Sequence, residues 1–193
     1  TVATQGANDP QDRLADLTIG SEVLLQASGS GSLNLGSGAV VAGIADFSLD
    51  IGTMTVVTGN VALGTLTNAS VVSVNVVDAS VFVGTGHAGL DATTHAVLPR
   101  GADAIGFDVS GVGFALVSVT DTQGTGASYA GVAASLTQAA LVGVSGVELY
   151  VSGSVKFNQA PTAERVDWTV ATQGANDPQD RLADLTIGSE VLL

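Results

Sequence analysis

Cysteine is absent from this sequence of 193 residues, and basic residues are scarce. Without cysteine the chain cannot form disulfides, thiolate metal sites or a cysteine nucleophile. Five Lys and Arg residues stand against 18 Asp and Glu residues, which gives a formal net charge of −13. Nucleic acids and anionic membrane surfaces bind proteins mainly through clusters of Lys and Arg. The acidic composition therefore excludes both as partners.

Long apolar runs are also missing, and aromatic residues make up only 4% of the chain. A transmembrane helix requires about 20 predominantly apolar residues. Here every apolar run is interrupted by Gly, Ser, Asp or Asn well before that length, so we expect no membrane insertion. At 46% hydrophobic residues the chain can still bury a core, which excludes wholesale disorder.

Apolar residues alternate with small polar residues along much of the chain. The alternation is regular in the ranges 47–52 (FSLDIG) and 72–76 (VSVNV). A period of two predicts half-buried β-strands. The 25 glycines are too many for a helical protein and lack the period of collagen. Residues 121–126 (DTQGTG) predict a hairpin tip, so we expect antiparallel neighbours in at least this half of the chain.

The sequence contains a perfect tandem repeat. Residues 1–25 are identical to residues 169–193, an offset of 168 residues (169 − 1). Identity over this length indicates recent duplication, or continuing exchange between copies, within a longer array. The alternative is an engineered duplication, which also presupposes a repeating parent. We therefore divide the chain into one full structural repeat, 1–168, and the start of the next, identical repeat, 169–193. With 14 acidic and 4 basic residues in 1–168, each repeat adds a charge of −10.

These observations predict an all-β fold. We favour an elongated β-solenoid-like or continuous superhelical β-sheet array, because stacking repeats would cover the strand edges at each end. The alternative is a string of discrete β-sandwich domains joined at residues 158–184. This polar joint contains Pro161, Trp168 and Pro178. It forms either a short helical turn with Asp177 as N-cap or an irregular linker with local Asx turns.

Residues 86–104 interrupt the alternation and predict a surface excursion from the β scaffold. His87 and His95 lie in it with Asp91 between them, but this spacing does not guarantee metal-binding geometry, and exposed loop histidines are the commoner interpretation. The range 84–89 (GTGHAG) matches a dinucleotide-binding fingerprint in its letters only, because the strand–helix context is absent. No nucleophile elbow or phosphate loop occurs. We therefore predict no cofactor and no catalytic residues, and classify the chain as not an enzyme.

Acidic residues recur at short spacing near the repeat joint, and they are the weak candidates for a metal site: Asp9, Asp12, Asp16, Asp177, Asp180, Asp184. Calcium prefers such carboxylate ligands, and a metal at a joint would stiffen a fibre. A complete calcium loop, with its central Gly and bidentate Glu, is not present. A solvated acidic turn is therefore favoured, and calcium binding remains possible.

Several motifs resemble those of long tandem repeats in giant bacterial surface and secreted proteins, the repetitive adhesin-like or fibre-forming class. The resemblance rests on residues 106–111 (GFDVSG), 128–131 (SYAG), 140–149 (ALVGVSGVEL), 176–178 (NDP) and 181–185 (RLADL). It implies an elongated, β-rich, often exported stalk or filament without catalytic residues. The chain differs from calcium-binding repeat toxins because their tandem glycine-rich nonapeptides are absent.

The sequence thus predicts a structural protein at the cell surface or in the extracellular space. Its expected role is a repeat of a filament, sheath or adhesin stalk. Its expected partners are adjacent repeats of the same protein and laterally associated copies. The alternative is a ligand-binding adhesive module that uses the 86–104 excursion to bind surface glycans.

Overall fold

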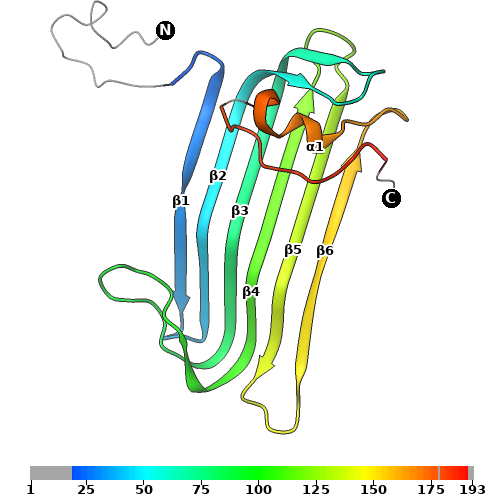
Figure 1. Cartoon of the computed structure of the whole chain (residues 1–193). Coiled ribbons are helices and arrows are strands. Elements are labelled where there is room, and N and C mark those ends of the chain that lie inside the picture. Colours follow the sequence, from blue (N-terminus) through cyan, green and yellow to red (C-terminus); the bar gives the residue numbers. More distant parts are fainter. Residues whose placement is uncertain (1–18, 178, 191–193) are drawn as a thin grey trace, which may run out of the picture.

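The computed structural model of the chain describes residues 19–177 and 179–190 and forms a single antiparallel sheet of six strands (Figure 1). The spatial order equals the chain order: β1 (Val23–Leu35), β2 (Val40–Val57), β3 (Thr65–His87), β4 (Arg100–Thr120), β5 (Ser128–Val142), β6 (Leu149–Gln159). Two short helical turns follow, α1 (Trp168–Ala171) and η2 (Gly174–Asn176). The sheet is open, with β1 and β6 as its edges. The all-β prediction is therefore confirmed.

Local turn chemistry explains how the strands are joined. The hairpin predicted at 121–126 links β4 to β5, because the Asp121 side chain accepts hydrogen bonds from the backbone N–H groups of Gln123, Gly124 and Thr125. This is the capped turn geometry that Asp favours. Between β3 and β4 the irregular segment is residues 88–99, shorter than the expected 86–104, since β3 continues to His87 and β4 begins at Arg100.

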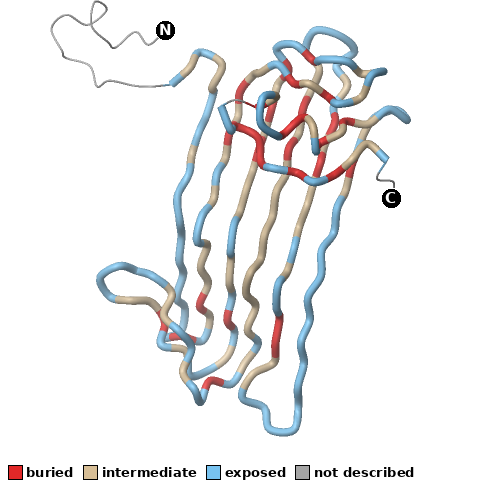
Figure 2. Tube along the Cα trace, in the orientation of Figure 1, coloured by how far each residue is buried: buried red, intermediate tan, exposed pale blue. Residues whose placement is uncertain are grey.

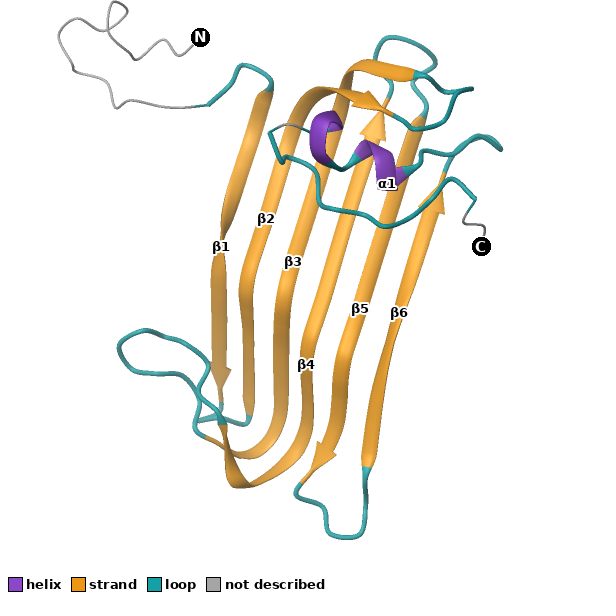
Figure 3. Ribbon diagram, viewed as in Figure 1, coloured by secondary structure: helices purple, strands orange, loops and turns teal. Residues whose placement is uncertain are grey.

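After β6, residues 160–177 and 179–190 cross one face of the sheet; we call them the covering segment (Figure 3). The segment reaches β2, where Arg181 contacts Asp50, and then returns to β6, where the backbone oxygen of Gly188 accepts a hydrogen bond from Asn158. Successive side chains of a strand point to opposite faces. The face under the covering segment is the covered face, and the other is the open face.

The main core lies between the covering segment and the ends of β2 to β5, where most buried residues gather (Figure 2). Its fully buried side chains come from both sides of the interface: Val56, Val71, Val117, Val119, Val166, Trp168, Leu185, Ile187. Leu185 and Ile187 lie beyond position 168. The core therefore crosses the sequence boundary between the two repeats.

A smaller core lies at the opposite end of the covered face. Val41 and Phe82 are buried there against Leu90 and Val97 of the 88–99 loop. Leu90 and Val97 form an isolated antiparallel bridge, so the loop is a small hairpin folded onto the sheet. Between the two cores, the middle of the covered face carries polar residues such as Ser80 and Asp78.

The four inner strands each contain one extra residue near the middle of the sheet. Three residue steps on β2, from Phe47 to Ile44, match two steps on β1, and β5 differs from β6 in the same way between Leu136 and Ala139. On β3 and β4 the irregularities coincide with positive φ at Asp78 (52°) and Gly111 (64°). Bulges of this kind bend a sheet and increase its twist. The edge strands have none at this level.

Candidate functional site at the repeat junction

A buried ion pair fixes the covering segment to β2. Arg181 Nη2 donates to Asp50 Oδ1 at 2.7 Å, and Arg181 Nε lies 3.1 Å and 3.2 Å from the two Asp50 oxygens. Arg181 Nη1 also donates to the backbone oxygen of Thr53. The side chains of Arg181 and Asp50 are only 3% and 5% exposed. The hydrogen bonds to Asp50 hold the pKa of the Arg181 guanidinium above its usual value, so the pair stays charged.

Asp177 organises the turn that presents Arg181. Its Oδ1 accepts the backbone N–H of Arg181 at 3.1 Å, and its Oδ2 accepts that of Leu182 at 2.6 Å. Burial raises the pKa of Asp177, although these two hydrogen bonds oppose the shift. The backbone N–H of Asp180 donates to the Asp177 carbonyl, which closes a single turn. The described helix α1 is earlier in the chain, and its N-cap is Asp167.

The structure separates the acidic metal candidates into different environments. Asp177 uses both carboxylate oxygens for backbone hydrogen bonds, whereas Asp180 and Asp184 are exposed. Asp9, Asp12 and Asp16 lie outside the described residues. Within 19–177 and 179–190, no group of three or more His, Asp or Glu side chains is arranged to hold a metal ion. Calcium binding stays a prediction.

Two residues of β6 hold the end of the covering segment. Lys156 Nζ donates to the carbonyl and the hydroxyl oxygens of Thr186 at 2.7 Å and 2.9 Å. The Asn158 amide donates to Val166 and Gly188 carbonyls and accepts from Trp168 Nε1 at 3.0 Å. Because Lys156 bonds Thr186 and Asn158 bonds Gly188, residues 186–188 run beside β6 in the same direction as that strand.

The string that ends the covering segment also precedes β1. Residues 20–22 (GSE) recur as 188–190, and both copies form a turn. In the first copy the Val23 N–H donates to the Gly20 carbonyl at 3.2 Å, and β1 begins at Val23. The Glu22 carbonyl accepts from the Thr53 N–H at 2.8 Å, which starts the pairing with β2. The junction sequence therefore reverses the chain and leads directly into a strand.

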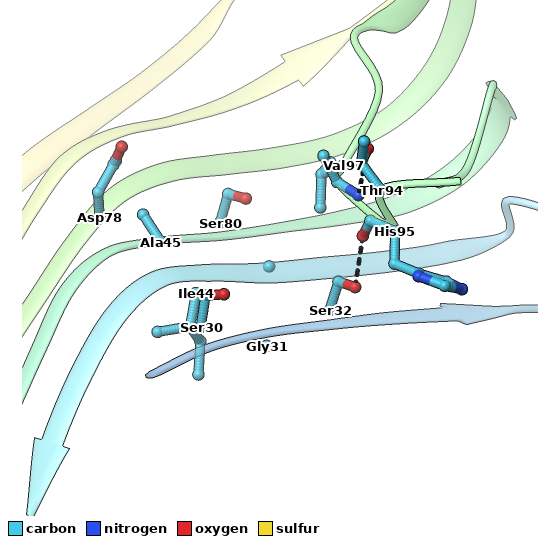
Figure 4. Close-up of a pocket in the computed structure, with 12 residues that line it drawn as sticks. Ser30, Gly31, Ser32, Ile44, Ala45, Asp78, Ser80, Thr94, His95 and Val97 are labelled. Carbon is cyan, nitrogen blue, oxygen red and sulfur yellow. Dashed lines mark hydrogen bonds between the residues drawn. The ribbon is translucent and has the colours of Figure 1, made fainter. Parts of the chain in front are cut away.

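The 88–99 loop forms the second polar site. A recess of about 450 Å³ lies between this loop and strands β1 to β3, lined by Ser30, Ser32, Asp78, Ser80, Thr94, His95 (Figure 4). The Ser32 hydroxyl donates to the backbone oxygen of His95 at 2.7 Å. Backbone N–H groups of Thr94 and Thr93 donate to Asp91 and hold the pKa of its carboxyl below the usual value.

The remaining excursion residues have structural partners. His87 Nδ1 accepts the N–H of Gly89, and its ring lies 5.1 Å from that of Phe82. Arg100 Nε pairs with Asp108 at 2.8 Å on the neighbouring part of β4. His87 and His95 thus make separate local contacts, and no metal-binding group forms around them among the described residues.

No pattern in the sequence predicts the main contacts of the covering segment. Arg181 and Asp50 are 131 residues apart, and no local pattern connects them. The available signal was composition, since Arg181 is the single basic residue in the second copy of the repeated string, among four acidic ones. A lone cation in such a segment needs a specific anionic partner when it is buried.

Comparison of the chain with protein-family models, with curated protein sequences and with solved structures returned no match. Neither helix in the part of the chain that the structure describes has the length and apolar character to cross a membrane.

Proposed function

We propose that this chain is a structural repeat of an extracellular filament, sheath or adhesin stalk, in which consecutive copies continue as one antiparallel sheet. The observation that carries the proposal is the path of the covering segment. It returns to the β6 edge and runs beside β6, and residues 188–190 there form a turn, as residues 20–22 do immediately before β1. The strand that follows, β1 of the next copy, would run antiparallel to β6 and next to it.

The two edge strands are suited to pair with each other. β1 has 13 residues and contains neither a charge nor a proline, and β6 has 11 residues with Lys156 as its one charge. Both edges are exposed along almost their whole length (Figure 2). Natural proteins protect exposed edges with charges, prolines or bulges, because bare edges aggregate. Long edge strands with so few protective residues are expected where each edge pairs with another strand in the assembled protein.

The proposed role is mechanical, and it needs no cofactor. Each junction combines a shared core, a buried ion pair and strand pairing, so consecutive copies would be joined without a flexible tether. The charge of −10 per repeat would keep neighbouring filaments soluble. An exported surface protein is consistent with this composition, and the extracellular location remains part of the proposal.

Electron microscopy of arrays of two, four and eight copies tests the proposal. Six strands at about 4.8 Å spacing predict that a continuous ribbon lengthens by about 29 Å per copy. Its width would be set by strand length, up to about 76 Å for the 23 residues of β3. Beads joined at variable angles would contradict the proposal and support discrete sandwich domains.

Adjacent proline substitutions provide a matched control for edge pairing. Neighbouring N–H groups of a strand point to opposite sides, so one of Ser152→Pro and Gly153→Pro blocks the outer edge of β6 while the other breaks its bonds to β5. We expect the outer-edge variant to fold as a single copy but to disrupt multi-copy ribbons. Intact ribbons with both variants would refute edge pairing.

A second candidate function is adhesion through the recess beside the 88–99 loop. The observation that favours it is the concentration of hydroxyl, carboxylate and imidazole groups around a recess of about 450 Å³, which suits a glycan. Binding to a glycan array should then fall after substitution of Ser30, Ser80 and His95, which line the recess, by Ala. Unchanged surface attachment by this triple variant would rule the adhesive function out.

A further inference from the structure

The open face of the sheet is apolar across all six strands. The strand register groups its residues into rows, and the row nearest the β1–β2 turn consists of Leu35, Val40, Val83, Phe107, Leu141, Leu149. Five such rows follow one another, from the row through Ala27 and Leu49 to this one. They contain only Ala, Val, Leu, Ile, Phe and Gly.

No described residue covers these rows. Both buried clusters lie on the covered face, under the covering segment and under the 88–99 loop. On the open face, Val155 is 59% exposed, Leu35 52% and Val83 49%. Exposed apolar patches larger than a few hundred Å² are rare on soluble proteins and mark interaction surfaces.

Charge is segregated away from the open face. None of the described acidic residues lies within the five rows. Asp50, Asp78 and Asp108 are on the covered face, Asp46 is at the bulge of β2 and Asp103 is near the start of β4, and the rest are in turns, loops or the covering segment. A chain with a net charge of −13 repels its own copies in most orientations. Two open faces can meet with no ionisable side chain between them, while the acidic groups remain in water.

The size of the patch matches a stable interface. Six strands at about 4.8 Å spacing give a width of about 29 Å, and five rows at about 6.6 Å give a length of about 33 Å. The flat footprint is therefore about 950 Å², against about 800 Å² per partner in a stable protein complex. Sheets that pack face to face lie about 10 Å apart and interdigitate aliphatic side chains of this kind.

We propose that the open face binds the open face of a second copy of the repeat, so that two sheets form a layered sandwich with their covered faces outward. This pairing goes beyond the proposed function, because it uses a different surface from the β1 and β6 edges. Within 19–177 and 179–190 all strands belong to one sheet, so none of these residues packs a second layer on the open face, and a second copy can supply it. In a filament, the same contact would join two ribbons or two segments of one array.

Sedimentation of the 193-residue chain over a range of concentrations tests the proposal. Val155→Glu places a charge on the open face at a position that is solvated in the single sheet, and Ser154→Glu places the same charge on the covered face of the same strand. We expect a dimer whose dissociation constant rises at least about tenfold with Val155→Glu and stays unchanged with Ser154→Glu, because a charge buried without a partner opposes association.

A second pair, Leu136→Glu and Ser135→Glu, repeats the comparison on the inner strand β5, and circular dichroism confirms that each variant is folded. The proline variant of the outer β6 edge separates the two surfaces: it should leave the dimer intact. A wild-type chain that remains monomeric at several hundred micromolar would overturn the proposal. A dimer that is abolished by the edge variant but unaffected by Val155→Glu and Leu136→Glu would also overturn it. A monomer that binds neutral phosphatidylcholine vesicles through this face would overturn it as well.

Discussion

Arg181 and Asp50 form the one ion pair of the described residues that is buried on both sides. Removing one partner leaves the other charge without water or a counter-ion, which typically costs about 3–5 kcal/mol. We therefore expect Arg181→Met to lower the free energy of unfolding by about that amount. Denaturant unfolding followed by the fluorescence of Trp168, the sole tryptophan, measures the loss directly.

A double variant is the control for this prediction. Arg181→Met combined with Asp50→Leu removes both charges, so it should recover a large part of the lost stability. If the single variant is as stable as the wild type, the pair contributes nothing and the anchoring described for the covering segment is wrong.

The carboxyl of Asp177 makes the stability of the junction depend on pH in a defined direction. Its pKa is raised by folding, so the folded state holds the proton more tightly than the unfolded state. Its contribution to the free energy of unfolding therefore falls as the pH rises from below 3.8, the ordinary pKa, through the raised folded value. Unfolding of the wild type and Asp177→Asn, compared between about pH 3 and about pH 6, should show the wild type losing stability relative to the variant. A difference that grows in favour of the wild type would mean that the pKa is lowered instead.

At the level of the elements, the contact between β5 and the covering segment depends on a missing side chain. A Cβ atom on Gly131 would lie 2.7 Å from Leu185 Cδ1 and 2.7 Å from Trp168 Nε1. Overpacking of this kind usually costs about 1–3 kcal/mol, so we expect Gly131→Ala to destabilise the chain within that range. Thermal unfolding of Gly131→Ala and Gly153→Ala checks it. Gly153 has open space around it and serves as the control, and an equal effect of both would contradict tight packing of the segment.

The strands were predictable from the sequence, and the covering segment was not. Alternation at 72–76 predicted part of β3 because a strand repeats its environment every two residues. The buried residues of the covering segment, such as Trp168, Leu182 and Leu185, follow no period, since an irregular segment packs according to its path. The end of β6 at Gln159 was close to the expected start of the joint at 158.

The contacts of the candidate residues were not predictable from the sequence. The acidic joint was identified, yet Asp177 turned out to bond backbone N–H groups of its own turn. The open apolar face was present in the alternation as well. The strand register shows that this face is apolar across all six strands. The sequence of each strand alone indicates only a half-buried strand.

For the whole molecule, calcium is the ligand whose removal gives the clearest test. The described acidic residues form no metal-binding group, and Asp177 already uses both carboxylate oxygens. Calcium bound at the acidic joint would raise the Tm of the chain, which scanning calorimetry measures with millimolar calcium and with a chelator. A clear rise in Tm with calcium but not with magnesium would show that the acidic joint binds the ion.

The direction of the covering segment has a mechanical consequence. In a ribbon whose strands lie perpendicular to its long axis, tension along that axis acts parallel to the inter-strand hydrogen bonds. It would separate neighbouring strands one pair at a time. Residues 181–186 of the covering segment run in the direction of that pull and are tied to β2 through Arg181, to β3 through Ala183 and to β6 through Thr186. Part of the load therefore passes through covalent backbone that spans several strands. Each repeat would therefore resist extension as a unit, and the first contact to break would be the pairing between β6 of one repeat and β1 of the next.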